Sequence, residues 1–166
     1  MKPRVYIETT VPSYLAAWPS RDVIRSSHQH LTREWWLNRR GAFDLFVSQI
    51  VLRECQAGDK IAAQSRMEYL RDLQVLDESP EVTALARGFI ELIPLPQRAV
   101  LDAMHIAIAT CHGMDYLLTW NCAHIANAMF RSKIVDICHS FDKEAPVICT
   151  PEELMARGDE RRGRYH

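Results

Sequence analysis

The sequence predicts an α/β fold, with a central, mostly parallel sheet of about five strands and helices on both of its faces. Three observations predict it. Short apolar runs alternate with longer segments of helical periodicity along the chain. The runs are apolar almost throughout, which is typical of parallel strands that are covered on both faces. The length of 166 residues suits one domain with a substantial core.

The first half of the chain contains three of the expected strands. They are at residues 4–8, 44–48 and 74–76. Helices are expected at residues 11–18, at 20–40, from about 48 through 54, and at 59–73. Thr10 can act as the N-cap of the first helix, with Pro12 tolerated in its first turn, and Gly41 ends the second helix.

The second half adds two strands, at residues 116–119 and 146–149. Helices are expected at residues 80–93, at 99–111 and around 124–129, with a last helix after Thr150. Ser79 and Pro80 mark a clear helix start, Gly113 marks a helix end, and the prolines between 94 and 96 indicate a loop. We therefore expect one domain over residues 1–155, followed by a basic C-terminal tail at 156–166.

The charge of the chain argues against a protein that coats nucleic acid by electrostatics alone, because the formal net charge is only −1. Arginines are nonetheless clustered. One cluster is Arg21, Arg25, Arg33, Arg39 and Arg40, and the other is Arg157, Arg161, Arg162 and Arg164. Each cluster can be interpreted as a phosphate contact or as a solvated helix face and a frayed tail.

The N-terminal residues lack the apolar core of a signal peptide, and no apolar run is long enough to cross a bilayer. A cytoplasmic protein with no membrane association is the expectation. The five cysteines contain no CxxC pair, which favours reduced thiols over disulfides. The closest group to a zinc site, at residues 111, 112, 122 and 124, has a spacing that matches no common tetrahedral pattern.

Polar side chains follow three of the expected strands. Glu8 ends the first strand, Glu54 follows the second, and Asn121 follows the fourth. In open parallel sheets, ligands bind beyond the carboxyl ends of the strands. Oxygen ligands from separate strand ends are what Mg²⁺ or Mn²⁺ requires. The alternative for Glu54 alone is a solvated glutamate on an amphipathic helix.

Asp102 lies in an otherwise apolar segment, AVLDAMHIAIAT. A carboxylate in the first turn of a largely buried helix is costly unless it is paired, capped or bound to a metal. A purely structural explanation is that the helix dipole favours a carboxylate at this end. His105 lies one turn further along, where it either positions a phosphate or water or is a packed, hydrogen-bonded histidine.

Four segments together resemble the PIN-domain family and its VapC-like toxins. YIETTVPSYL is similar to the family's opening, in which an acidic residue ends the first strand. VLRE resembles the second acidic motif, and LDAMHIAIAT followed by GMDYLLTWN resembles the third and fourth motifs. The four segments occur in the family's order over residues 5–154.

The resemblance implies a set of site residues. Those that match the family's metal-binding and catalytic positions are Glu8, Glu54, Asp102 and Asn121. Thr9 and Thr119 match hydroxyl positions that orient the carboxylates, and His105 and His124 are expected to border the site. Glutamate at position 8 and asparagine at position 121 depart from the usual aspartates, which reduces the expected metal affinity at Asn121.

The resemblance further implies a Mg²⁺- or Mn²⁺-dependent endoribonuclease, the toxin of a type II toxin–antitoxin system. Its partners would be an RNA substrate, single-stranded or looped, a cognate antitoxin protein and a second copy of the chain. The alternative is a catalytically weakened PIN fold that binds RNA or protein. A small-molecule phosphatase lacks support, because the chain has no glycine-rich phosphate loop and no nucleophile elbow.

Overall fold

The computed structural model describes residues 1–94 and 99–155, and these form a five-stranded sheet. The strands are β1 (Arg4–Ile7), β2 (Asp44–Ser48), β3 (Gln74–Leu76), β4 (Tyr116–Leu118) and β5 (Val147–Cys149). Their order across the sheet is β3-β2-β1-β4-β5, and every neighbouring pair is parallel. The predicted α/β fold with a parallel sheet is confirmed, and all five strands lie where the sequence places them.

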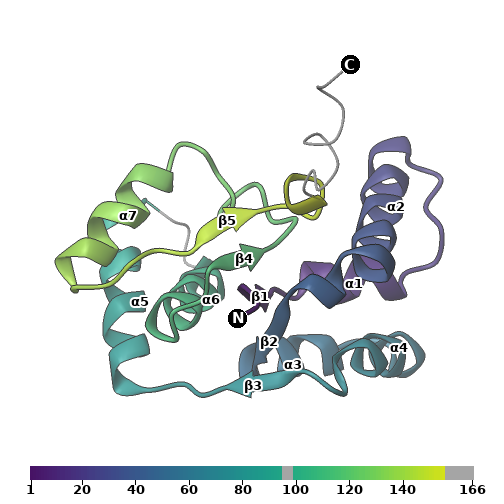
Figure 1. The fold of residues 1–166 in the computed structure, drawn as a ribbon, viewed down its shortest axis with the longest axis horizontal. Helices are drawn as coiled ribbons and strands as arrows, with labels where there is room; N and C mark the ends of the chain where they lie inside the picture. The colour runs from purple at the N-terminus through teal and green to yellow at the C-terminus, as the bar shows by residue number, and fades with distance from the viewer. Residues whose placement is uncertain (95–98, 156–166) are drawn as a thin grey trace.

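Seven α-helices connect these strands within the described residues. They are α1 (Thr10–Ala16), α2 (Val23–Asn38), α3 (Gln49–Gln56), α4 (Lys60–Leu70), α5 (Pro80–Leu92), α6 (Val100–Cys111) and α7 (Arg131–Ser140). Figure 1 shows α1 to α4 on one side of the sheet and α5 to α7 on the other. Short 3₁₀ turns follow α2 and β5, at Arg40–Ala42 and Glu153–Met155.

The strand order reverses direction once, between β1 and β4. From β1 the chain moves outward through β2 to β3, then returns to the other side of β1 to form β4 and β5. Because parallel crossovers are right-handed, the reversal changes the face that the helices cover. β1 and β4 are neighbours whose connections leave in opposite directions, and such a switch point opens a crevice at the carboxyl ends of the strands.

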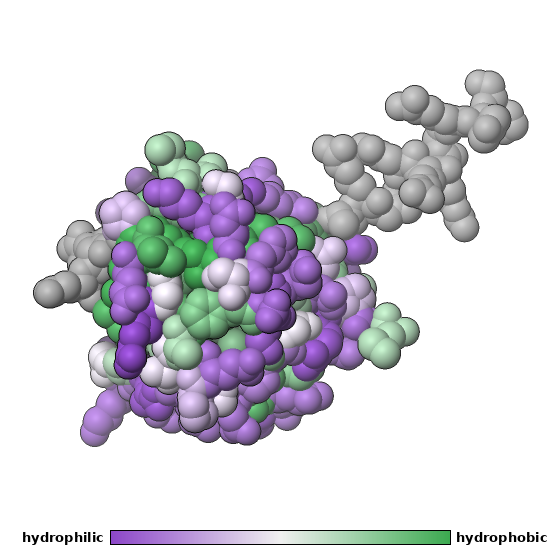
Figure 2. Space-filling model, turned by 90° about the vertical axis from the view of Figure 1, so that its left-hand side faces the viewer, coloured by the Kyte–Doolittle hydropathy of each residue, from purple (hydrophilic) through white to green (hydrophobic). Residues whose placement is uncertain are grey.

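The core lies between the sheet and its two helix layers. Val5, Tyr6 and Ile7 of β1 are fully buried, as central parallel strands require. Trp35 of α2 and Phe89 of α5 are also fully buried, on elements that lie on opposite sides of the sheet. Figure 2 faces the side of α5 and α7 and shows mostly hydrophilic side chains with apolar ones among them. None of the described helices is long and apolar enough to span a membrane.

Two predicted helix starts are wrong. Thr10 is not the N-cap of α1: the N-cap is Thr9, which makes no side-chain capping bond, and the Thr10 hydroxyl binds Glu8 instead. The helix expected from Ser20 begins at Val23, because Asp22 accepts a hydrogen bond from the backbone N–H of Arg25 and is the better cap. Glu8 takes the Thr10 hydroxyl in the first case, and Asp22 caps the helix in place of Ser20 in the second.

The helix expected around residues 124–129 is also wrong. These residues form turns, and the helix lies further along, at Arg131–Ser140. The Asn121 amide oxygen accepts from the His124 N–H, and that of Asn127 accepts from the Met129 N–H. The second bond takes a backbone donor that a helix over residues 124–129 would use.

The last helix expected after Thr150 is, within the described residues, a single 3₁₀ turn. The expected 94–96 loop and the basic tail lie wholly or partly outside the described residues. The five cysteines are free thiols, and the described residues contain no zinc-like group at positions 111, 112, 122 and 124.

Candidate functional site

The site begins where β1 and β4 end. Ile7 and Leu118 are partners in the sheet, so the next residues, Glu8 and Thr119, emerge side by side at the same edge. The backbone N–H of Glu8 donates to the Leu118 carbonyl at 3.1 Å, which continues the ladder by one residue. Glu8 is only 4% exposed. A buried carboxylate of this kind needs hydrogen-bond donors.

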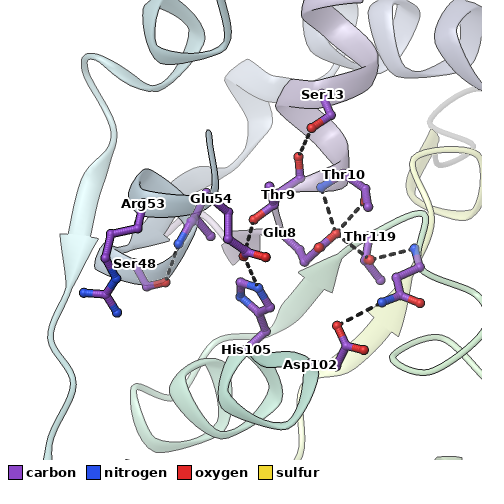
Figure 3. Close-up of polar contacts among 12 residues, drawn as sticks. Glu8, Thr9, Thr10, Ser13, Ser48, Arg53, Glu54, Asp102, His105 and Thr119 are labelled. Carbon is purple, nitrogen blue, oxygen red and sulfur yellow. Dashed lines mark hydrogen bonds and ion pairs between the residues drawn. The ribbon is translucent and has the colours of Figure 1, made fainter. Parts of the chain in front are cut away.

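Three donors hold one oxygen of the Glu8 carboxylate. Oε2 accepts from the backbone N–H of Thr10 at 3.0 Å, from the Thr10 hydroxyl, and from the Thr119 hydroxyl at 2.8 Å. Figure 3 shows these contacts around Glu8. The other oxygen, Oε1, accepts no hydrogen bond from the described residues and is not sealed from solvent. The carboxylate is therefore fixed by one oxygen and has the second available to a ligand.

Glu54 reaches the site from α3, which begins directly after β2. Its Oε1 accepts from the Thr9 hydroxyl at 2.7 Å and contacts Nε2 of His105 at 2.7 Å (Figure 3). Burial alone would raise the pKa of Glu54, but the hydrogen bond and charge of His105 and the hydrogen bond of Thr9 together lower that pKa from its ordinary value. Glu54 is thus held in the charged form that a cation requires.

His105 is a positioning residue at the back of the site, buried to 1% exposure. Its Nδ1 lies 2.7 Å from the Tyr6 hydroxyl, which lies 2.8 Å from the Ser48 hydroxyl. Burial alone would lower the pKa of His105, but its hydrogen bond to Glu54 and the negative charges of Glu8 and Glu54 raise it. Of the two roles weighed for His105, the structure shows the packed, hydrogen-bonded histidine.

The two hydroxyls beside His105 allow it either protonation state. When His105 is neutral, Tyr6 donates to Nδ1 and Ser48 donates to Tyr6; when it is charged, Nδ1–H donates to Tyr6, which donates to Ser48. Burial raises the pKa of Tyr6 well above its ordinary value, so Tyr6 stays a neutral phenol in both cases. Nε2–H donates to Glu54 throughout.

Asp102 lies in the first turn of α6, as predicted, and both of its oxygens are engaged. Oδ1 accepts from the Asn121 side-chain amide at 3.0 Å, and Oδ2 contacts Nδ1 of His124 at 2.7 Å. The amide oxygen of Asn121 accepts from the His124 N–H at 3.2 Å, so the amide nitrogen must face Asp102. In this arrangement Asn121 is a donor to Asp102, and its oxygen does not face the carboxylates.

The structure brings all eight predicted residues into two connected groups. Thr9, Glu54 and His105 form one; Glu8, Thr119, Asn121, Asp102 and His124 form the other, with Thr119 donating to Glu8 and accepting from the Asn121 N–H at 2.9 Å. Sequence reasoning missed Thr10, Tyr6 and Ser48. Only Thr10 carried a signal, because it is the second hydroxyl residue directly after Glu8.

The donor set fits a hard divalent cation in its chemistry. Oε1 of Glu8 and Oε2 of Glu54 accept no hydrogen bond from the described residues. Carboxylate oxygens are the preferred ligands of Mg²⁺ and Mn²⁺. Among residues 1–94 and 99–155, however, no three His, Cys, Asp or Glu side chains stand close enough to share an ion. Binding one ion to all three carboxylates therefore requires side chains to move.

Comparison with solved structures identifies the fold. The chain is similar to the crystal structure of VapC20 from Mycobacterium tuberculosis, described as a sarcin-ricin loop cleaving toxin, with a TM-score of 0.57. The fold is PIN-like. The two proteins are 13% identical, and the similarity covers 75% of this chain and 95% of VapC20. No protein-family model and no curated protein matches the sequence.

The similarity of this PIN-like chain to VapC20 is one of fold, because 13% identity is too low to carry an activity from one protein to the other. A functional argument must come from the side chains themselves. In this chain those are the three carboxylates at the carboxyl edge of the sheet and the hydroxyl, imidazole and amide groups that hold them.

Proposed function

We propose that the chain is a Mg²⁺- or Mn²⁺-dependent endoribonuclease. The observation that carries the proposal is the arrival of Glu8, Glu54 and Asp102 from three separate elements at the carboxyl ends of the strands. A divalent cation bound among these carboxylates would be attracted by all three charges. Two of the three also have an oxygen available to such a cation.

Glu8, Glu54 and Asp102 are the residues that would hold the metal. When bound, it would polarise a phosphodiester and lower the pKa of a water molecule. Thr119 and Thr10 orient Glu8, while Thr9 and His105 orient Glu54 and keep it charged. Asn121 and His124 orient Asp102 through its two oxygens. Asn121 was predicted as an oxygen ligand, and that role requires its amide to turn.

RNA is the proposed substrate class, supported by the PIN-like fold that the chain shares with VapC20, a toxin described as cleaving the sarcin-ricin loop. The role of toxin, with a cognate antitoxin and a second copy of the chain as partners in the cytoplasm, extends this proposal. It rests on the four sequence segments that resemble VapC-like toxins.

A second candidate function is an RNA- or protein-binding module with the same fold. One observation favours it: both oxygens of Asp102 are already engaged by Asn121 and His124, a neutral amide and an imidazole in place of a second acid. Unlike Glu8 and Glu54, Asp102 therefore has no oxygen that is free of a hydrogen bond. Metal binding and cleavage separate the two candidates.

The test is cleavage of a labelled single-stranded RNA by purified, partner-free protein in Mn²⁺. The wild type is compared with Asp102→Asn and with Asp136→Asn, an exposed carboxylate on α7 that serves as the matched control. We expect cleavage by the wild type and by the control, and a loss of at least about a hundredfold in Asp102→Asn.

Metal binding gives a second readout that does not depend on activity. Mn²⁺ should raise the melting temperature of the wild type and of Asp136→Asn, because a ligand that binds only the folded state stabilises it. It should raise that of Asp102→Asn less. If the wild type shows no cleavage and no melting shift, the nuclease is rejected in favour of the binding module.

A further inference from the structure

A hollow of about 260 Å³ lies between α1 and α2. Its lining residues are Ser13, Tyr14, Ala17, Arg25 and Gln29. Drug-sized ligands occupy pockets of about 300–1,000 Å³, so this hollow suits a smaller, flat group such as one nucleobase. None of its lining residues belongs to the eight residues of the acidic site.

Three aromatic rings hold the hollow in a fixed relation to the acidic site. Trp120 follows Thr119 directly; its backbone N–H donates to the Thr10 hydroxyl at 2.8 Å, and its indole N–H donates to Thr32 at 2.7 Å. His28 stacks on Trp120 with ring centroids 4.0 Å apart and planes 13° apart. Tyr14 meets both rings edge-on, at 5.9 and 6.2 Å.

This aromatic group is therefore attached to the same hydroxyl that holds Glu8. Thr10 donates to Glu8 and accepts from Trp120, and the Ser13 hydroxyl donates to the Thr9 carbonyl at 2.8 Å. α1 itself begins two residues after Glu8. Glu8 and the hollow are therefore both connected to the first turns of α1.

The polar groups of the hollow divide into satisfied and unsatisfied ones. Gln29 is 2% exposed, accepts from the Ser20 N–H and donates to the Trp18 carbonyl, so it forms a fixed wall. The Tyr14 hydroxyl and the Arg25 guanidinium make no hydrogen bond within residues 1–94 and 99–155, and neither group is sealed from solvent. A flat ring, an uncommitted hydroxyl and a cation suit an unpaired nucleotide.

We propose that this hollow binds an unpaired base of the RNA strand, with Tyr14 as the stacking surface and Arg25 as the contact to the adjoining phosphate. The inference rests on the proposed function, because it places the strand whose phosphate lies at Glu8, Glu54 and Asp102. His28, held flat against Trp120, fixes the orientation of Tyr14. The hollow thereby gives the nuclease a preference for single-stranded over paired RNA.

Binding of a short, labelled single-stranded RNA tests the proposal, measured by fluorescence anisotropy on the full chain in EDTA so that no cleavage occurs. We expect Tyr14→Ala to weaken binding about tenfold and Tyr14→Phe to retain most of the affinity, because stacking needs only the ring. Arg25→Ala should weaken binding and reduce its salt dependence by about one phosphate contact. Arg71→Ala is the matched control, since Arg71 is an exposed arginine that precedes β3, at the opposite end of the sheet.

The same RNA with its bases replaced by abasic sites isolates the stacking contact. Tyr14→Ala should bind this probe as the wild type does, while Arg25→Ala should still lose affinity. Equal loss on both probes, unchanged RNA affinity in Tyr14→Ala, or no wild-type binding would each overturn the proposal. Cleavage in Mn²⁺ with unchanged binding in Tyr14→Ala would reject the base pocket alone, and Tyr14-dependent binding without cleavage would reject the nuclease alone.

Discussion

Single hydroxyl groups determine how the acidic residues of this protein are held. The Thr119 hydroxyl donates to Glu8 and accepts from the backbone of Asn121, so it joins the end of β1 to the loop after β4. The Thr10 hydroxyl donates to Glu8 and accepts from Trp120. Both hydroxyls use their donor and their acceptor, which is why they orient a carboxylate more firmly than a single contact would.

At the same scale, the Glu54–His105 pair predicts a dependence of stability on pH. The pKa of Glu54 is lowered in the folded protein, so its contribution is present above its ordinary pKa of 4.5 and is lost as the pH falls through the lowered value. The pKa of His105 is raised, so its contribution is complete below its ordinary pKa of 6.5 and is lost as the pH rises through the raised value. The pair stabilises the fold most between these two limits.

Urea unfolding in EDTA measures this dependence without competition from a cation. From about pH 5.5 to about pH 8, the free energy of unfolding should fall by more in the wild type than in Glu54→Gln, which keeps a polar side chain at position 54 but removes the charge. Parallel curves for the two proteins would show that the pair does not titrate as the structure implies.

At the scale of elements, the start of α3 fixes both a helix and a site residue. Ser48 is its N-cap and accepts from the Val51 N–H at 3.3 Å, while the same hydroxyl contacts Tyr6. α3 then carries Glu54 to the site less than two turns later. A change at Ser48 therefore affects the helix and the chain of hydrogen bonds that supports His105.

Ser48→Ala should lower the free energy of unfolding by about 2–3 kcal/mol, the sum of a lost cap and a lost buried hydrogen bond to the Tyr6 hydroxyl. The matched control is Ser79→Ala, which removes an equivalent N-cap from α5, where Ser79 also accepts at 3.3 Å. It should cost only about 1 kcal/mol. Equal losses in thermal or urea unfolding would show that the contact with Tyr6 adds nothing to the cap.

Across the whole molecule, Leu154 connects the C-terminal end of the described fold to α2. Leu154 is 6% exposed, and its carbonyl accepts from the indole N–H of the buried Trp35 at 3.2 Å. This contact joins the 3₁₀ turn after β5 to α2, on the other side of the switch point. One domain over residues 1–155 stays a prediction.

A chain that ends after Met155 should keep the melting temperature of the full chain. A chain that ends after Thr150 loses Leu154 and should be destabilised by about 2–5 kcal/mol, the range for removing a buried leucine. Differential scanning calorimetry of the three proteins tests the boundary. A large loss in the chain that ends after Met155 would place part of the fold in residues 156–166.

Local pattern in the sequence was sufficient to determine the strands and most of the helices. Short apolar runs identified all five strands, and the Ser79-Pro80 start and Gly113, with φ of 64°, marked helix ends correctly. These features depend on neighbours a few residues apart, where steric and capping preferences act. Prediction failed at residues 124–129, where the Asn127 side chain takes the Met129 N–H that periodicity assigns to a helix.

By itself, the sequence determined that this protein has a parallel α/β fold and that Glu8, Glu54, Asp102 and Asn121 are its candidate site residues. Only the tertiary structure decided which of them touch. Strand order places β4 beside β1, so the Thr119 hydroxyl donates to Glu8, a residue 111 positions away in the sequence. Asp102 contacts the Asn121 amide and the His124 imidazole. The tertiary structure also placed His105 between Tyr6 and Glu54. Such contacts follow from crossover handedness and packing, which no local pattern of residues records.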